Sequence, residues 1–355
     1  MVSYIDFDSI NYTKQIMKSL RESIFSDVED IVSNDTVLIE QFLKDNYDIS
    51  GTYTIKDNIV DVDGYVDVKN KDLESLTNGI FRFGKVSGSF WADHCTKLKS
   101  LEGAPKEVGM RFSCYECRNL VSLEGAPEKV DKDFECAICT KLKTLEGAPE
   151  KVGGYFSCNE CKKLTSLKGA PKEVGESFYC GKCCNLTSLE GAPEKVGRDF
   201  FCHECKKLTS LEGVSKKIGR YFNCYYCPML KSLNGVQKTI YGNFDCRKCN
   251  SLTSLEGAPE EVDGDFECAT CIGLVTLKGG PKIVKGNFNL ACCTELKSLK
   301  HAPEKVGGNF WCSGCSSLTS LEGAPEKIGR GLHCQRCKNL TITDQDKIKY
   351  NIKNY

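Results

Sequence analysis

The sequence predicts a repeat solenoid, because one unit of 22 residues recurs along most of the chain. The unit is clearest in LKTLEGAPEKVGGYFSCNEC, residues 142–161. Phe112 recurs at a step of 22 through Phe310, and Cys95 recurs at the same step through Cys337, which gives twelve copies. A fixed period of this length is typical of solenoids, in which each repeat buries its apolar face only against its neighbours.

Composition limits the classes of protein to consider. The 355 residues include 48 basic and 48 acidic ones, so no overall field favours nucleic acid or an anionic membrane. Asp6 and Asp8 lie where a signal peptide would have an apolar run. No stretch reaches the roughly 18 apolar residues of a membrane span. We therefore expect a cytoplasmic protein whose 24 cysteines are mostly reduced.

The first segment, residues 1–51, lies outside the repeats and is predicted to be an N-terminal helical cap. Apolar residues at a spacing of four predict an amphipathic helix over residues 11–32. Asn34 or Asp35 is the expected N-cap of a second helix that contains Ile39 and Leu43. We expect these helices to cover the open end of the solenoid, and a separate docking domain is the alternative.

Residues 52–85 are predicted to form a degenerate capping turn or a first partial repeat. Apolar and polar residues alternate loosely here, and Asp63-Gly64 indicates a turn. Leu73 and Leu76 then reproduce the L-x-x-L of the repeats. Terminal repeats are commonly atypical, so we assign this segment to the start of the stack.

Residues 86–343 are predicted to form the twelve-strand solenoid, and residues 344–355 a C-terminal tail that covers its last turn. In each copy F-x-C predicts a short strand, with Phe156 and Cys158 facing inward and Ser157 outward. Neighbouring copies should pair as a parallel sheet about 55 Å long, at about 4.8 Å per strand. The half E-G-A-P-x-x-V-G contains too many helix breakers for a helix, so it predicts an extended or turn-like back face.

The repeat resembles the leucine-rich repeat family, whose consensus is L-x-x-L-x-L-x-x-N/C-x-L. Phe156 and Cys158 match its inward strand positions, Cys161 its Asn/Cys ladder, and Leu164 the following Leu. The resemblance covers residues 66–340 and is greatest to short bacterial and phage-type repeats. It implies a right-handed, curved solenoid with a partner-binding concave sheet. Phe in place of the strand Leu, and Cys as the first strand aliphatic, depart from that family.

The cysteines form two continuous columns, and ten repeats contain C-x-x-C. Two such pairs ordinarily indicate zinc. However, the first Cys occupies an inward strand position, where Ala92 and Leu290 replace it. We predict that the first Cys packs as a small hydrophobe, that the second donates its S–H to a neighbouring turn, and that no cofactor is bound. The alternative zinc ligands come from two adjacent repeats: Cys114, Cys117, Cys136 and Cys139.

Functional information is expected in the columns that vary. Exposed aromatic and basic residues concentrate between residues 178 and 249, where Ser215 and Gln237 also replace the Pro of the repeat. Tyr and Arg are favoured binding anchors because they combine contact area with directed polar groups. The predicted partner-binding residues are Tyr155, Tyr179, Phe201, His203, Tyr221, Tyr225, Tyr226, Arg247 and Lys248.

These observations predict a non-catalytic scaffold that binds an unidentified protein through its concave sheet, with no membrane or small-molecule partner. The alternative is a zinc-binding Cys solenoid with a structural or metal-storage role. Nucleic acid is not expected, because the same face carries Glu135, Glu204 and Glu267. Catalysis is not expected, because the four His are scattered and no nucleophile, base and orienting group converge.

Overall fold

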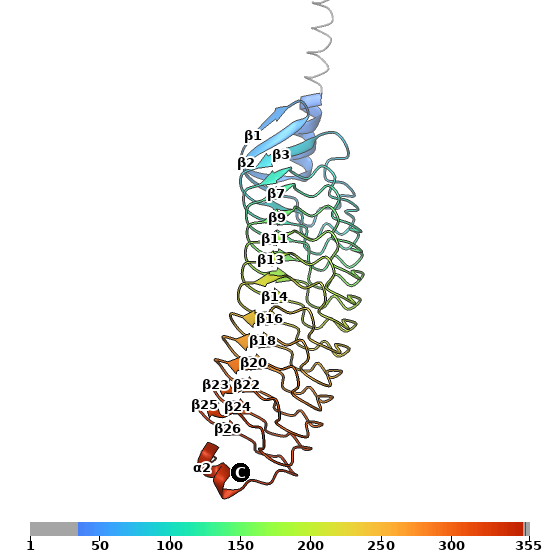
Figure 1. Cartoon of the computed structure of the whole chain (residues 1–355). Helices are drawn as coiled ribbons and strands as arrows, with labels where there is room; N and C mark the ends of the chain where they lie inside the picture. Colours follow the sequence, from blue (N-terminus) through green and yellow to red (C-terminus); the bar gives the residue numbers. More distant parts are fainter. Residues whose placement is uncertain (1–34, 351, 353–355) are drawn as a thin grey trace, which may run out of the picture.

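The chain forms one elongated, gently curved solenoid in the computed structural model shown in Figure 1. The structure describes residues 35–350 and residue 352. Two parallel β-ladders run along the stack, and each turn contributes one short strand, mostly of two residues, to each ladder. The repeat solenoid predicted from the 22-residue period is confirmed. The helix predicted over residues 11–32 lies outside the described residues.

The first ladder, called the Phe ladder below, is built from the F-x-C phrase. Each Phe pairs in register with the Phe of the next turn, as Phe156 does with Phe134 and Phe178. Its strands are β4 (Phe90–Trp91), β6 (Phe112–Ser113), β8 (Phe134–Glu135), β10 (Phe156–Ser157), β12 (Phe178–Tyr179), β14 (Phe200–Phe201), β16 (Phe222–Asn223), β18 (Phe244–Asp245), β20 (Phe266–Glu267), β22 (Phe288–Asn289), β24 (Phe310–Trp311) and β26 (Leu332–His333).

The Phe side chains form the centre of the core, and all of those in this ladder are fully buried. Successive ring centroids lie 5.1–5.6 Å apart, mostly in stacked orientation. Aromatic pairs at such separations contribute about 0.5–1.5 kcal/mol beyond the burial of their area. The same side chain therefore stabilises the turn before it and the turn after it.

The second ladder, called the Val ladder, is built from the x-V of x-V-G and forms the extended back face that the sequence predicted. Regular pairing along this face was not predicted. Its strands are β3 (Arg82–Val86), β5 (Glu107–Val108), β7 (Lys129–Val130), β9 (Lys151–Val152), β11 (Glu173–Val174), β13 (Lys195–Val196), β15 (Lys217–Ile218), β17 (Thr239–Ile240), β19 (Glu261–Val262), β21 (Ile283–Val284), β23 (Lys305–Val306) and β25 (Lys327–Ile328).

The glycines of the back face explain why it is not helical. Gly125, in E-G-A-P, has φ +83°, and an added Cβ would lie 2.5 Å from the backbone N of Glu102. Gly153, which follows Val152, lies so close to the preceding turn that a Cβ would be 2.0 Å from Asp131 O. The two glycines therefore fix a turn and a close approach between backbones, which only Gly permits without displacing a neighbour.

The Val ladder is interrupted once, between β15 and β17, where Gln237 replaces the Pro of the repeat. The Gln237 side chain accepts a hydrogen bond from Ile218 N (2.8 Å) and donates to Ile218 O (3.0 Å). One side-chain amide thus replaces the next strand as the partner of Ile218. The Phe ladder continues through these turns. Figure 1 shows the stack straight through its blue and green turns and bending from about β14 onward.

The stack begins with an antiparallel hairpin of β1 (Asp48–Lys56) and β2 (Ile59–Asp67). β2 pairs with β3 and also with β4, so one strand starts both ladders. The hairpin turns at Asp57-Asn58, whose φ angles of 50° and 56° fit a type I′ turn.

The turn predicted at Asp63-Gly64 is wrong. Gly64 lies within β2 opposite Gly51, and a Cβ on Gly64 would be 1.7 Å from Ser50 O. This glycine is therefore required by the close approach of two strands and not by a change of chain direction.

Both ends of the described stack are covered by a helix. Residues 35–46 form the helix predicted to follow Asn34 or Asp35. Its buried side chains Ile39 and Leu43 lie in line with Tyr47, whose hydroxyl donates to Leu76 O. The N-terminal helical cap is thus confirmed for the described residues.

At the other end, α2 (Asp344–Tyr350) replaces the predicted polar tail and buries Tyr350. Thr343 Oγ1 accepts from Asp346 N (3.1 Å), and the Asp346 carboxylate accepts from Thr343 N (3.0 Å). This reciprocal pair is a capping box, and T-x-x-D was its signal in the sequence.

The second Cys of each turn forms the hydrogen-bond ladder that the sequence predicted. Its Sγ lies 3.0–3.3 Å from a backbone carbonyl of the preceding turn, 25 residues earlier in all turns except the first, where Cys95 donates to Val68 O. These thiols are buried. Each therefore adds a hydrogen bond between successive turns at a carbonyl that pairs with no neighbouring strand, although several of these carbonyls also accept a backbone N–H of their own turn.

The buried thiols make stability sensitive to alkaline pH. Burial raises the pKa of Cys95 and of Cys334 to about 11 and raises that of Cys180 further. Thiols of the unfolded chain ionise near pH 8.5, so this contribution to stability is complete below that pH and is lost as the pH rises through the folded values. We expect the free energy of unfolding to fall by about 1.4 kcal/mol per pH unit for each such thiol above roughly pH 9.

Denaturant titrations in a reducing buffer, from about pH 7.5 to 10.5, measure this slope. Alkylation of native protein at neutral pH should modify Cys292, the exposed thiol among the described cysteines, ahead of the buried columns. A free energy of unfolding that stays constant to the top of this range would contradict the expected burial.

Candidate functional site

Three columns of outward side chains accompany each strand of the Phe ladder. The first column follows the Phe and the second follows the first Cys. The third column is the next residue, and its φ is positive, 55–73°, in all twelve turns. The left-handed conformation is compatible with a turn and not with a continuing strand, so the chain leaves the ladder at this residue. Side chains of the same column thus repeat along the stack at the spacing of the strands.

Four aromatic side chains form a continuous line across neighbouring turns. Tyr155 meets Tyr179 edge to face, with ring centroids 5.9 Å apart. Tyr179 stacks on Phe201 at 4.9 Å with an interplanar angle of 2°. Phe201 meets Tyr221 edge to face at 5.5 Å. Tyr179 and Phe201 are therefore each held between two rings of the line, and Tyr155 and Tyr221 form its ends.

Asp245 is the polar centre of the next turns, and it is 1% exposed. Its carboxylate accepts hydrogen bonds from Arg247 Nε (3.0 Å), Arg247 Nη2 (2.6 Å) and the Tyr221 hydroxyl (3.1 Å). Asn223 Nδ2 also donates to the Tyr221 hydroxyl, at 2.9 Å. A buried carboxylate therefore fixes both an exposed guanidinium and the end of the aromatic line.

Tyr225 joins the remaining cationic and aromatic side chains. The Arg247 guanidinium lies 5.5 Å from the centre of its ring. Lys248 Nζ donates to its hydroxyl at 2.9 Å. Tyr226, one residue later, lies 6.1 Å away between ring centroids. Cation–π contacts of this kind are worth about 0.5–1 kcal/mol at exposed positions.

His203 lies beside this line, with its ring centroid 6.4 Å from that of Phe201. Its imidazole covers Gly181, where an added Cβ would be 2.4 Å from Cε1 of the ring. Nδ1 is buried without a hydrogen-bond partner, and burial lowers the pKa of His203. The neutral imidazole is therefore the form that this position favours.

The structure brings together all nine residues that the sequence singled out. They form one network of ring contacts and hydrogen bonds, called the aromatic strip below, although their exposure differs. Tyr226, Arg247 and Lys248 are exposed, and the other six are half-buried.

Sequence reasoning missed Asp245, which connects the aromatic and basic halves of the strip. It also missed Asp199, which receives two hydrogen bonds from Arg220 at 3.0 Å. An Asp in an outward column next to Tyr and Arg was the available signal.

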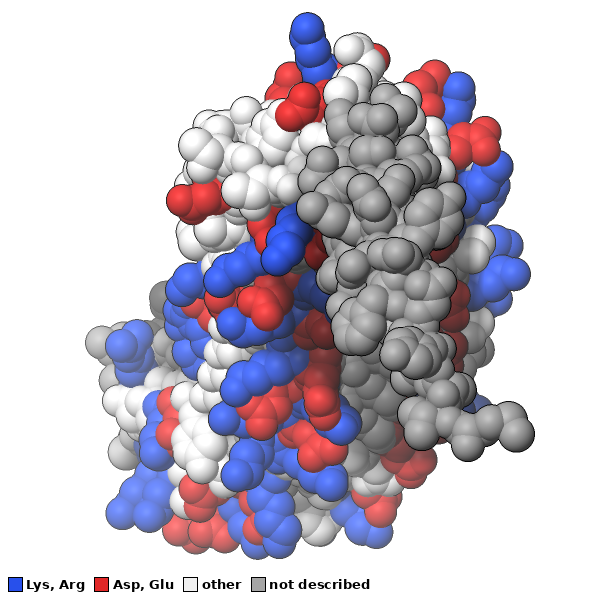
Figure 2. Space-filling model, turned by 90° about the horizontal axis from the view of Figure 1, so that it is seen from above, with Lys and Arg blue, Asp and Glu red and all other residues white. Residues whose placement is uncertain are grey.

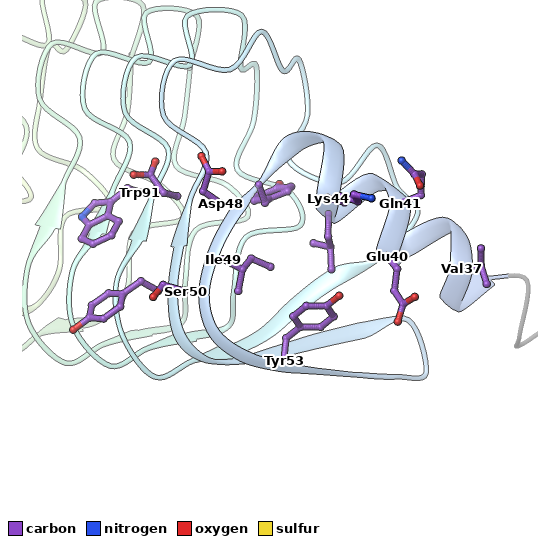
Figure 3. Close-up of a pocket in the computed structure, with 13 residues that line it drawn as sticks. Val37, Glu40, Gln41, Lys44, Asp48, Ile49, Ser50, Tyr53 and Trp91 are labelled. Carbon is purple, nitrogen blue, oxygen red and sulfur yellow. The ribbon is translucent and has the colours of Figure 1, made fainter.

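A cavity of about 860 Å³ lies at the N-terminal end of the described stack, between the helix of residues 35–46 and the β1–β2 hairpin. Figure 3 shows Tyr53 facing it from β1 and Trp91 from β4. Trp91 stacks on Tyr65 at 5.6 Å with an interplanar angle of 4°, and Lys69 Nζ lies 4.4 Å from the Trp91 ring. Sequence reasoning did not identify this cavity, because its lining residues are spread from Val37 to Trp91.

The alternative zinc ligands Cys114, Cys117, Cys136 and Cys139 are all buried in the core columns. Among the described residues, one group of at least three potential metal ligands has all its ligand atoms within 4.8 Å of one another. That group is Cys246, Cys268 and Cys271, five turns further along the stack than the predicted set. Hydrogen bonds from Cys246 and Cys268 lower the pKa of Cys271.

Acidic and basic side chains lie close together at the N-terminal end of the described stack. Figure 2 shows acidic and basic side chains beside one another around the N-terminal turns. Several join successive turns, as Lys99 does with Glu74 (2.6 Å) and Lys172 with Glu150 (2.5 Å). Across the described residues, none of the helices has the length and apolar character needed to cross a bilayer.

Comparison of the chain with protein-family models, with curated proteins and with solved structures finds no match. The assignment of a function therefore depends on the geometry of this surface.

The contact between Asp245 and Arg247 predicts an asymmetric effect of two neighbouring substitutions. Arg247→Ala leaves a buried carboxylate without its guanidinium and should cost about 2 kcal/mol of stability. Lys248→Ala removes an exposed amine and should change stability by less than about 0.5 kcal/mol.

Urea unfolding of the two variants measures both values. The double variant Asp245→Asn/Arg247→Ala removes the charge together with its partner and should recover part of the loss. Equal effects of the two single substitutions would show that the protein does not depend on the Asp245–Arg247 pair.

Proposed function

We propose that this protein is a non-catalytic scaffold that binds another protein through the aromatic strip. The observation that carries the proposal is the hydrogen bonding of Asp245, which holds Arg247 and Tyr221 in place before any partner arrives. Fixing long side chains in advance reduces the entropy lost on binding, which is about 0.5–1.5 kcal/mol for each immobilised side chain. Tyr and Arg held in this way are the residue types that dominate interface energies.

The strip is suited to a protein partner by its combination of aromatic rings, hydroxyl groups and two cations. Tyr226, Arg247 and Lys248 provide the exposed part, and the half-buried rings of Tyr179 and Phe201 extend the strip over the preceding turns. Such a surface combines apolar contact area with directed donors at its margin, as protein interfaces do.

We also propose that the solenoid is of the leucine-rich repeat type, with the Phe ladder on its concave side. The S–H ladder supports this, because Cys161 donates to the carbonyl of Cys136 (3.3 Å) at the position of that family's Asn/Cys column. The Val ladder is an additional feature that the resemblance did not imply.

A cytoplasmic, non-enzymatic role is part of the same proposal. The free thiols of the described chain suit a reducing compartment. The histidines make separate contacts: His94 pairs with Glu116 (3.2 Å), and His333 stacks on Trp311 (3.8 Å) far along the stack.

A pull-down from extracts of cells that naturally express the chain tests the proposal. The double variant Tyr226→Ala/Lys248→Ala removes exposed side chains of the strip without unpairing Asp245, so it should fold normally and lose the partner. The matched control Lys305→Ala/Lys327→Ala changes exposed residues of the Val ladder and should retain it. Unchanged capture by Tyr226→Ala/Lys248→Ala would exclude the strip as the binding site.

A second candidate function is metal binding at the core cysteines. It is favoured by the group Cys246, Cys268 and Cys271, and by the lowered pKa of Cys271, because a metal ligand must be a thiolate. Against it, Cys271 Sγ lies 3.1 Å from Cys246 O and donates to it as a thiol. Binding of zinc would break this member of the hydrogen-bond ladder.

Metal analysis by mass spectrometry of protein purified under reducing conditions separates the two functions. For a scaffold we expect no stoichiometric metal, close to complete titration of thiols in denaturant, and a melting temperature that a chelator does not change. One or more zinc ions per chain, together with a melting temperature that falls on chelation, would instead support the Cys solenoid.

A further inference from the structure

Basic and acidic residues are segregated on one edge of the solenoid, although the chain carries equal numbers of both. This edge consists of the four residues after the second Cys of each turn. Over nine consecutive turns, from Thr96 to Val275, these positions contain ten basic residues and no acidic one. The basic residues are Lys97, Lys99, Arg118, Lys141, Lys143, Lys162, Lys163, Lys206, Lys207 and Lys231.

Within the described residues, seven of these lysines are exposed and form no ion pair, and we call them the lysine edge. The other three basic residues pair with Asp72, Glu74 and Glu116. Lys141 and Lys207 donate to Asn119 (2.6 Å) and Asn185 (2.8 Å), which leaves their charges uncompensated. The lysine edge consists of Lys141, Lys143, Lys162, Lys163, Lys206, Lys207 and Lys231.

The lysine edge is a narrow row parallel to the axis of the stack. Its lysines come from turns that are about 4.8 Å apart, so the row is about 20 Å long. An extended polypeptide rises about 3.3 Å per residue, so some six residues would cover it. Acidic residues of the third outward column, Glu160 and Glu204, begin the same turns and limit the width of the positive row.

The row shares turns of the solenoid with the aromatic strip. Tyr226 begins the turn that carries Lys231, and Lys248 Nζ is held against Tyr225 in the neighbouring turn. A single partner segment that lies along the stack would therefore meet the exposed aromatic end of the strip and the lysine edge together.

The surroundings favour a polypeptide over single-stranded nucleic acid. Nucleic acid without sequence preference needs free aromatic faces on which bases stack. Here Tyr179 and Phe201 stack on each other, and Arg247 and Lys248 lie within 5.5 Å of the centre of the Tyr225 ring. The positive charges of the lysine edge remain available for binding, and carboxylate side chains of a polypeptide would neutralise them.

We infer that the lysine edge binds an acidic segment of a polypeptide partner, in extended conformation along the axis of the stack. This inference deepens the proposed scaffold function and rests on it. The segment carries about three or more Asp or Glu side chains within roughly six residues, so that one carboxylate meets the row at every second residue of an extended strand.

Fluorescence anisotropy with the full chain and a labelled twelve-residue peptide of alternating Glu and Ser tests the inference. We expect binding that weakens as salt is added, because exposed charges are screened. The charge-reversal variant Lys206→Glu/Lys207→Glu/Lys231→Glu should reduce affinity at least tenfold. The matched control Lys195→Glu/Lys305→Glu/Lys327→Glu places the same change on exposed lysines of the Val ladder and should have little effect.

Three outcomes would overturn the inference. They are an equal loss of affinity in both triple variants, no binding of the Glu peptide, or tighter binding of a single-stranded oligonucleotide of the same length. Circular dichroism melts of both variants establish that they are folded. The pull-down with Tyr226→Ala/Lys248→Ala remains a separate test, so the scaffold function stands if only the lysine edge fails.

Discussion

The structure depends on one constraint, which is that each turn must lie in register with the turn 22 residues away. Phe pairs with Phe and Val with Val along two ladders, so every buried ring contacts the same ring of the next turn at 5.1–5.6 Å. No turn can bury its apolar side chains alone. Both ends of the described stack are accordingly covered, one by the β1–β2 hairpin with the helix of residues 35–46 and the other by α2.

The cysteines serve the same constraint. A thiol is small enough to fill an inward strand position, and its S–H is a sufficient donor for a carbonyl at the corner of the turn, where no strand partner is available. Cys158 and Cys161 illustrate the two roles: the first is fully buried in the same core as the Phe rings, and the second donates to the previous turn at 3.3 Å. A larger polar side chain would satisfy the carbonyl and disturb the packing, so the volume and the donor strength of Cys suit this position together.

The aromatic strip depends on the regular spacing of the Phe ladder and on one residue, Asp245, that departs from the repeat. The columns place Tyr179 directly over Phe201, and Asp245 then anchors the following turn by accepting from Tyr221 and Arg247. Behind these turns, the Gln237 side chain separates two strands of the Val ladder, and the stack bends in this region in Figure 1. The proposed binding surface therefore lies where the curvature changes.

The sequence by itself determined the solenoid, its period, the inward columns and the thiol ladder, because each is repeated many times and the repetition removes ambiguity. It also selected the nine residues of the strip, since columns that vary stand out against columns that do not. It did not determine the Asp63-Gly64 region, where Gly64 permits strand contact and does not form a turn, or the pairing along the Val ladder. Only the tertiary structure decided that Asp245 is buried and holds Arg247, and that the cavity beside Trp91 exists. These features depend on contacts between turns and on single residues, which a repeating pattern cannot specify.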